Sequence, residues 1–240
     1  MAIASSTLDQ GASSPGTTSF STGTITPTAN ACVILNVVTG NPTTTPSFNS
    51  ISASGCGLTW TLVAEQRSTS GVFLQSFFVG QGASPSSGAV TVSGISSSDN
   101  VLWQVVEFTG VKTTGAYGGN GVASLHNGSG TQPTVTLPNS LTTGSAIYAS
   151  FMHANFGSIT WSGGLTAQST PQVSGINGTI YDGKDLTATS TTVAATVTGT
   201  PQSWTMLAVE ILPYVAGGFM RPPLLNGIST GGPFFANPLG

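Results

Sequence analysis

Residues 101–111 read VLWQVVEFTGV, and residues 203–214 read SWTMLAVEILPY. In each stretch apolar residues occupy both sets of alternating positions; in the first, Leu102 and Val106 oppose Trp103. Successive side chains of a β-strand point to opposite faces of its sheet, so a strand of this kind must be covered on both faces. We expect a second sheet and a loop, or another subunit, to provide that cover.

The rest of the chain contains short runs of β-branched and aromatic residues between clusters of Gly, Ser, Asn and Pro, and helical periodicity is almost absent. These patterns predict an all-β, antiparallel fold of sandwich or barrel type. The predicted strands span residues 32–39, 58–66, 72–80, 88–94, 101–109, 133–137, 145–153, 158–162, 178–182, 192–198 and 203–212.

An internal repeat relates the two halves of the chain. The matched segments, in order, are ACVILNVV at 31–38 with SAIYASFM at 145–152, LTW ending at Trp60 with ITW ending at Trp161, AVTVSG at 89–94 with AATVTG at 194–199, and the strand of Trp103 and Glu107 with that of Trp204 and Glu210. Two tandem small sandwiches are one explanation. The other, which we favour, is a single jelly-roll sandwich built from two similar five-stranded halves, 31–111 and 145–214. The Gly-rich segment 112–132 fits a linker or a long loop.

The two ends differ from this sandwich domain, which we place at 28–215. Residues 1–27 lack strand-like alternation, so we expect an extended arm. Residues 216–240 are rich in Gly and Pro but also apolar, unlike a disordered tail, so this C-terminal arm should dock on its own domain or on a neighbour. We predict contacts between subunits. The partner-binding candidates are Phe219, Met220, Leu224, Leu225, Phe234, Phe235 and Leu239.

Charge is unusually scarce. Only 5% of the residues are Asp, Glu, Lys or Arg, and the net charge is −3, whereas about 25% is typical of soluble domains. Four basic residues cannot neutralise a run of phosphates, which argues against nucleic-acid binding. The N-terminal stretch has neither a basic nor an apolar region, so we expect no secretion signal. No apolar run reaches the length of a membrane helix, so we expect no membrane span. A surface of Ser, Thr, Asn, Gln and Gly suits a protein locked into an assembly, or an extracellular β-protein.

Few residues offer catalytic chemistry. Facing carboxylates can hydrolyse glycosides, and Glu107 and Glu210 occupy equivalent places in the repeat, but we interpret them as hydrogen-bond acceptors that anchor turns. The sequence contains no nucleophile elbow that could work with a histidine. We expect His126 to lie in a solvated loop and His153 to lie at the rim of the sandwich. The run from Tyr181 to Asp185 is predicted to be a charged hairpin turn rather than a calcium site. We therefore expect no enzymatic activity, catalytic residue, cofactor or metal.

Cysteine and aromatic residues complete the candidates. Cys32 and Cys56 are predicted to be free thiols, with a disulfide as the alternative. The four tryptophans fall within predicted strands and are assigned to the core. Tyr117 and Phe156 lie outside regular strands and are the aromatic candidates for sugar binding.

The segments TITPTANACVILNVV (24–38), LTWTLV (58–63), AVTVSG (89–94) and WQVVEFTGV (103–111) carry a family resemblance. Over about residues 20–214 the chain resembles a sandwich domain of structural proteins encoded by tailed bacteriophages. Such proteins include capsid decoration proteins, head fibres and tail-associated adhesins, which are usually non-enzymatic and often oligomeric. The resemblance implies a virion protein that is made in the host cytoplasm, forms a homo-oligomer and binds the major capsid protein or tail proteins. The alternative is an adhesin for a surface glycan or receptor.

Overall fold

A computed structural model describes residues 1–13, 16–41, 45, 47, 50–68, 73–129, 132–153, 158–168, 173–174, 178–198 and 203–215. Within these ranges the regular structure is all β, with seventeen strands and no helix, which confirms the predicted fold class. The strands are β1 (Ala4–Ser13), β2 (Ser19–Ser21), β3 (Cys32–Gly40), β4 (Ser52–Gly55), β5 (Thr59–Arg67), β6 (Phe73–Gln81), β7 (Val90–Ser93), β8 (Asn100–Thr109), β9 (Tyr117–Ser129), β10 (Thr134–Thr136), β11 (Ala146–His153), β12 (Ile159–Ser162), β13 (Thr166–Ala167), β14 (Val173–Ser174), β15 (Thr179–Asp185), β16 (Thr192–Val197) and β17 (Ser203–Ile211).

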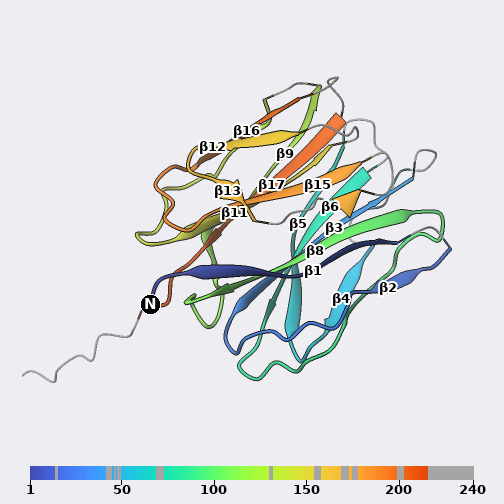
Figure 1. Cartoon of the computed structure of the whole chain (residues 1–240), viewed down its shortest axis with the longest axis horizontal. Helices are drawn as coiled ribbons and strands as arrows, with labels where there is room; N and C mark the ends of the chain where they lie inside the picture. Colours follow the sequence, from blue (N-terminus) through green and yellow to red (C-terminus); the bar gives the residue numbers. More distant parts are fainter. Residues whose placement is uncertain are drawn as a thin grey trace, which may run out of the picture.

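These strands form four antiparallel sheets. The first half of the chain contributes a large sheet, β1-β8-β3-β6-β5, and a small sheet, β2-β7-β4. The second half contributes another large sheet, β13-β15-β11-β17-β9 with β14 beside β15, and another small sheet, β10-β16-β12. Figure 1 shows β12 and β16 on one side of the molecule and β2 and β4 on the opposite side, with the large sheets between them.

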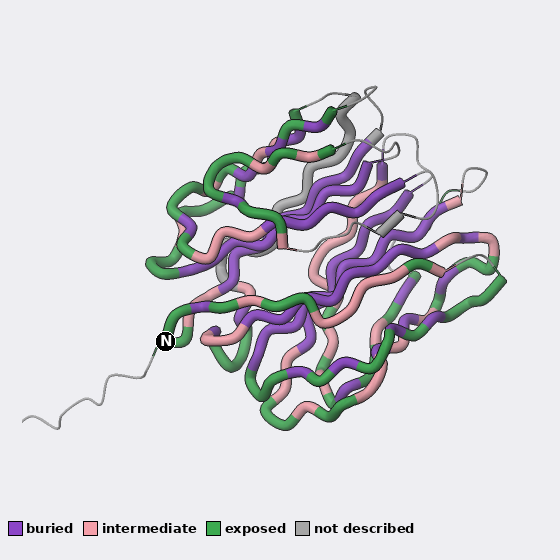
Figure 2. The backbone as a smooth tube through the Cα atoms, in the orientation of Figure 1, coloured by how far each residue is buried: buried purple, intermediate pink, exposed green. Residues whose placement is uncertain are grey.

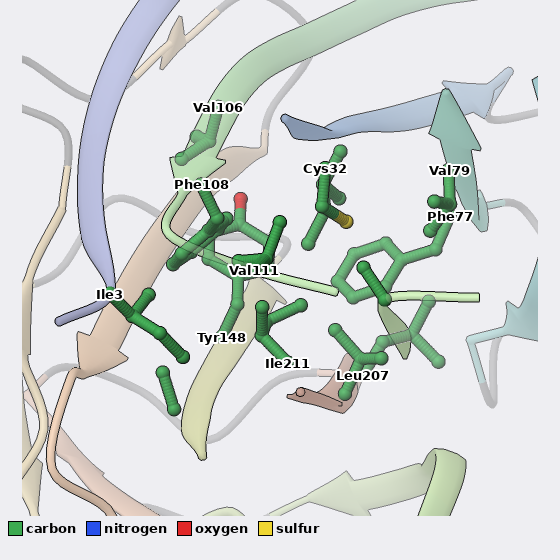
Figure 3. Packing of buried hydrophobic residues seen from close by; sticks show 14 residues of the cluster. Ile3, Cys32, Phe77, Val79, Val106, Phe108, Val111, Tyr148, Leu207 and Ile211 are labelled. Atoms are coloured by element: carbon green, nitrogen blue, oxygen red, sulfur yellow. The ribbon is translucent and has the colours of Figure 1, made fainter. Parts of the chain in front are cut away.

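The packing between sheets explains the two-faced strands. Val106 and Phe108 of β8 face the second large sheet, where they join a core with Tyr148 of β11 and Leu207 of β17 (Figure 3). On its other face β8 packs against the small sheet β2-β7-β4 through Trp103. The large sheets are therefore covered on both sides, and their central strands β3, β8 and β11 are buried almost throughout (Figure 2). A single two-sheet jelly-roll is not confirmed, because the small sheet of each half provides the second cover.

The segments expected to lack strands contain several. Within residues 1–27, β1 pairs along β8 and β2 pairs with β7, so this segment belongs to the sheets and is not a free arm. Within residues 112–132, β9 pairs with β17. The C-terminal arm, 216–240, lies outside the described residues.

The repeat is only partly matched as predicted. Strands β3, β7 and β8 occupy the same places in their sheets as β11, β16 and β17. Trp60, however, lies in β5 of a large sheet, whereas Trp161 lies in β12 of a small sheet. Three-residue matches such as LTW and ITW are too short to fix a strand's place. Trp103 and Trp204 differ by two positions when the strands are aligned on Glu107 and Glu210. An offset of two keeps both tryptophans on the face toward a small sheet.

Candidate functional site

Glu107 anchors the turn that leads into β3. Its carboxylate accepts hydrogen bonds from the backbone N–H and the hydroxyl of Thr28. The turn closes through a hydrogen bond from the Ala31 N–H to the Thr28 carbonyl, 3.1 Å. Asn30 adopts the left-handed conformation within it, with φ of 60°. The geometry confirms the turn-anchoring interpretation of this glutamate.

Glu210 does the same in the second half. Its Oε1 accepts a hydrogen bond of 2.7 Å from the N–H of Thr142. The Ser145 N–H closes that turn onto the Thr142 carbonyl at 3.0 Å, and Gly144 takes the left-handed place with φ of 80°. The two glutamates therefore hold equivalent turns, each at the start of a central strand.

The same two glutamates cannot work as a catalytic pair. Glu107 lies on the same face of β8 as Trp103, which is the face toward the small sheet β2-β7-β4. Glu210 lies on the same face of β17 as Met206, which is the face toward the small sheet β10-β16-β12. Both large sheets thus stand between the two carboxylates. Packed sheets are about 10 Å apart, and a glycosidase needs its carboxyl groups within about 5–9.5 Å across an open cleft.

Two further acids are placed differently from the prediction. The segment Tyr181–Asp185 is part of β15, not a hairpin turn, because it pairs with the central strand β11. Asp182 is buried and accepts a hydrogen bond of 3.2 Å from the Tyr148 hydroxyl. Burial, and then the charge of Asp182 and this bond, raise the pKa of Tyr148 well above its ordinary value. Asp185 accepts a hydrogen bond from the Thr187 N–H at 2.9 Å. In the part of the chain that the structure describes, no three His, Cys, Asp or Glu side chains gather as metal ligands would.

Asp9 and Glu65 also have internal partners. Asp9 Oδ2 accepts hydrogen bonds from Trp103 Nε1 at 2.8 Å and from the Gly23 N–H at 3.0 Å. Glu65 Oε1 accepts one from the Ser76 hydroxyl at 2.9 Å.

His153, Cys32 and Cys56, whose side chains the structure describes, do not form a reactive group. His153 is buried, stacking on Phe151 with ring centroids 5.9 Å apart, so its predicted position at the rim is wrong. His126 lies in β9, and its side chain is outside the described part. Cys32 and Cys56 are both buried free thiols, as predicted, and burial raises the pKa of Cys32 to about 12. A thiol with so high a pKa is a poor nucleophile at neutral pH.

The small sheet β2-β7-β4 turns a regular array of hydroxyl groups outward. Its inward residues, such as Phe20 and Val92, are buried in the core. The outward residues form two cross-strand rows, Ser19–Ser93–Ser52 and Ser21–Thr91–Ser54. Strands lie about 4.8 Å apart and alternate residues about 6.6–6.8 Å apart along a strand. We call these six residues the first hydroxyl face.

The small sheet of the second half presents a similar surface. Val135, Val193 and Val197 point inward. The outward residues pair as Thr136–Thr192, Thr134–Ala194–Ser162 and Thr196–Thr160, and we call them the second hydroxyl face. The two hydroxyl faces lie on opposite sides of the molecule, with the two large sheets between them (Figure 1). Neither face contains a charged side chain.

A hollow of about 920 Å³ opens where the N-terminus meets the loops of the second half. Ile3, Leu141 and Leu186 give it apolar walls, and Thr142, Thr189 and Ser190 add hydroxyl groups. None of its lining residues has an ionisable side chain. The side chains that line the hollow are therefore apolar or neutral, and the ionisable group among the lining residues is the α-amino group of Met1.

Of the two aromatic candidates for sugar binding, the structure describes only Tyr117. Tyr117 packs half-buried against the core between the large sheets, and Phe156 lies outside the described residues. Trp103 and Trp204 are buried, as predicted, and stack or pack within their own halves. Trp60 and Trp161 are half-buried.

Comparison with family models, curated proteins and solved structures finds no match to this chain. None of the described residues forms a helix with the length and apolar character that a membrane crossing requires. The seven partner-binding candidates of the C-terminal arm lie beyond residue 215, outside the described part.

Proposed function

We propose that this chain is a non-enzymatic accessory protein of a virus particle, of the capsid decoration or tail-associated type. One observation supports a structural role above all: the carboxylates of Asp9, Glu65, Glu107, Asp182 and Glu210 are all engaged by groups of the protein itself. A general acid or nucleophile needs a free oxygen facing substrate in a cleft. These carboxylates hold turns, strands and side chains in place.

The hydroxyl faces support attachment to a larger assembly. A flat, uncharged surface can pack against another protein without the desolvation cost of buried charge. Its hydroxyl groups, which both donate and accept, can pair with backbone or side-chain groups of the partner. The major capsid protein or a tail protein is the partner we propose for these faces.

We further propose that the protein consists of two similar halves, each a jelly-roll in its own right. When each half is numbered from its own first strand, leaving out β14, both large sheets have the order 1-8-3-6-5 and both small sheets the order 2-7-4. Eight strands in two sheets with this winding are typical of a jelly-roll. The shared turns of Glu107 and Glu210 support a common origin for the halves.

The alternative function is a carbohydrate- or receptor-binding adhesin on the same fold. The hollow beside Leu141 and Thr142, with its mixture of apolar walls and hydroxyl groups, favours this alternative over an ion or nucleotide site. Binding of the purified protein to a printed glycan array, lost on filling the hollow by Thr142→Trp, would support the adhesin. No glycan binding, together with specific labelling of virus particles by an antibody, would support decoration.

An antibody raised against the purified protein tests the virion proposal. Immunogold electron microscopy of lysates from the source culture should label virus particles at regular positions on the head or tail. Gold on cell envelopes with bare particles beside them would contradict the proposal.

A further inference from the structure

The central strands of the two large sheets align residue by residue. Val33 of β3 and Ile147 of β11 pair with the equivalent glutamates, Glu107 and Glu210. This alignment carries over to the neighbouring strands of each sheet. The resulting equivalent positions are Val38 and Met152, Gln75 and Ile180, Leu102 and Thr205, Phe77 and Asp182, and Gln104 and Leu207.

The two large sheets face each other with approximate twofold symmetry. β5, at one edge of the first, packs against β9 of the second, and β1, at the other edge, packs against β14. The axis therefore passes between β3 and β11. On it, Asn36 meets its own equivalent, Ser150, and donates a hydrogen bond of 2.7 Å from Nδ2 to Oγ.

Away from the axis each contact occurs twice, and the two copies have opposite chemistry. On one side the Thr205 hydroxyl donates a hydrogen bond of 2.7 Å to Gln75 Oε1, and both residues are fully buried. On the other side the equivalent residues, Leu102 and Ile180, belong to one apolar cluster with Met152. A polar residue thus meets a polar residue on one side, and an apolar residue meets an apolar residue on the other.

A second set of positions shows the same contrast between apolar and polar residues. Phe77 and Leu207 lie in the apolar core between the large sheets. Their equivalents, Asp182 and Gln104, are both polar and buried.

Pairing of a half with a copy of itself would break these matches. Two first halves would place Gln75 against Leu102, and two second halves would place Thr205 against Ile180. Gln75 would keep its hydrogen bond to Asn36 of the same half, but each arrangement would take away the bond between Gln75 Oε1 and the Thr205 hydroxyl. A buried hydrogen-bonding atom that loses its partner is the costly case.

We infer that the central faces of the two halves form a matched pair, in which each half recognises the other and rejects a second copy of itself. The partner of each face is thus the other half of the chain, selected by the polar pair Gln75–Thr205 and the apolar pair Leu102–Ile180. This inference rests on the two-half architecture and is independent of where the protein sits on a particle.

Exchanging the two chemistries tests the inference. The double variant Q75I/I180Q should match each half to itself at this one set of positions and leaves Phe77, Gln104, Asp182 and Leu207 unchanged. Between first halves the isoleucine introduced at position 75 would face Leu102, and between second halves the glutamine introduced at position 180 would face Thr205. A specific protease site inserted between Thr113 and Thr114, in an exposed segment, allows the folded full chain to be cut. After cutting and re-equilibration in mild denaturant, native mass spectrometry should find only mixed complexes for the unsubstituted protein. The double variant should show complexes of two first halves.

The uncut chain supplies a second measurement. Q75I/I180Q should lower the denaturant midpoint of unfolding, and the quadruple variant Q75I/I180Q/L102T/T205L, which restores both pairs in exchanged positions, should regain most of that loss. V92A is the matched control, because Val92 is buried away from the central interface; it should lower the midpoint without producing paired first halves. Paired first halves from the unsubstituted protein, or a quadruple variant no more stable than the double, would overturn the inference.

Discussion

Individual acidic residues in this protein act as structural acceptors, and Glu107 is the clearest case. Replacing it with Gln keeps an acceptor for the Thr28 N–H but removes the charge that strengthens the bond. We expect E107Q to lower the free energy of unfolding by about 1 kcal/mol, and E210Q to do the same through Thr142. Denaturant unfolding followed by tryptophan fluorescence measures both. Hydrolysis of a glycan by the native protein, lost in either variant, would contradict the structural role.

Cys32 gives a residue-scale prediction for alkaline pH. Burial raises the pKa of the Cys32 thiol from its ordinary value of 9.0 to about 12 in the folded protein. Between these values the unfolded chain has released the proton and the folded chain has kept it, so stability falls as pH rises, by at most about 1.4 kcal/mol per pH unit. C32A should flatten the fall from pH 9 upward. Y148F should matter only from about pH 10. A native Cys32 that reacts with a thiol reagent at pH 9 as fast as in the unfolded chain would refute this account.

At the scale of elements, contact with the core decides which strands can be predicted from sequence. The eleven predicted strands are all present, because each has at least one face turned toward the core and so an apolar pattern. The pattern misses β1, which lies at a sheet edge and whose sequence ASSTLDQGAS contains no buried residue. It also misses β9 for its Gly-rich composition, and β2, β4, β13 and β14 because they are short. Edge strands need little apolar side-chain area, so period-two alternation disappears there.

Gly11 tests whether β1 is an integral strand. It lies opposite Trp103, and a methyl group on it would come within 2.3 Å of the indole ring. We expect G11A to destabilise the protein by roughly 1–3 kcal/mol, as overpacking does. G88A is the matched control, since a methyl group there meets nothing within 4 Å, and it should change stability by less than about 0.5 kcal/mol. Amide hydrogen exchange along β1 should rise only in G11A; equal effects of the two substitutions would mean that β1 is loosely attached.

At the scale of the whole molecule, the sequence predicts that the two-faced strands must be covered on both faces, but it does not predict which sheets cover them. The two-faced strands of Trp103 and Trp204 require a layer on each side, and each half supplies its own small sheet as well as the shared interface. The buried pair Gln75 and Thr205 could not be anticipated, because a contact between residues so far apart in the chain depends on how the sheets stack. The hydroxyl faces are foreseeable only as composition: a chain with 5% charged residues must expose Ser and Thr.

The C-terminal arm provides the last prediction. Its apolar residues include Phe219, Leu224 and Phe234, and burying one such side chain is worth roughly 1.5–3 kcal/mol. Several together can offset the cost of ordering a segment that proline already stiffens. None of the seventeen described strands extends beyond Ile211, so the four sheets should not require the arm. A chain truncated after Tyr214 should therefore unfold at nearly the same temperature as the full chain.

The same truncation should abolish self-association or attachment to the particle, because we propose that the arm docks on a neighbouring subunit. Sedimentation velocity of the two chains, with circular dichroism to follow unfolding, separates the outcomes. A substitution of Phe234 and Phe235 by Ser in the full-length chain is the matched control, since it keeps length and backbone while removing apolar area. If the truncated chain assembles normally, the arm is not the contact. If it unfolds, the arm packs on its own domain, and the proposal that the arm docks on a neighbouring subunit fails.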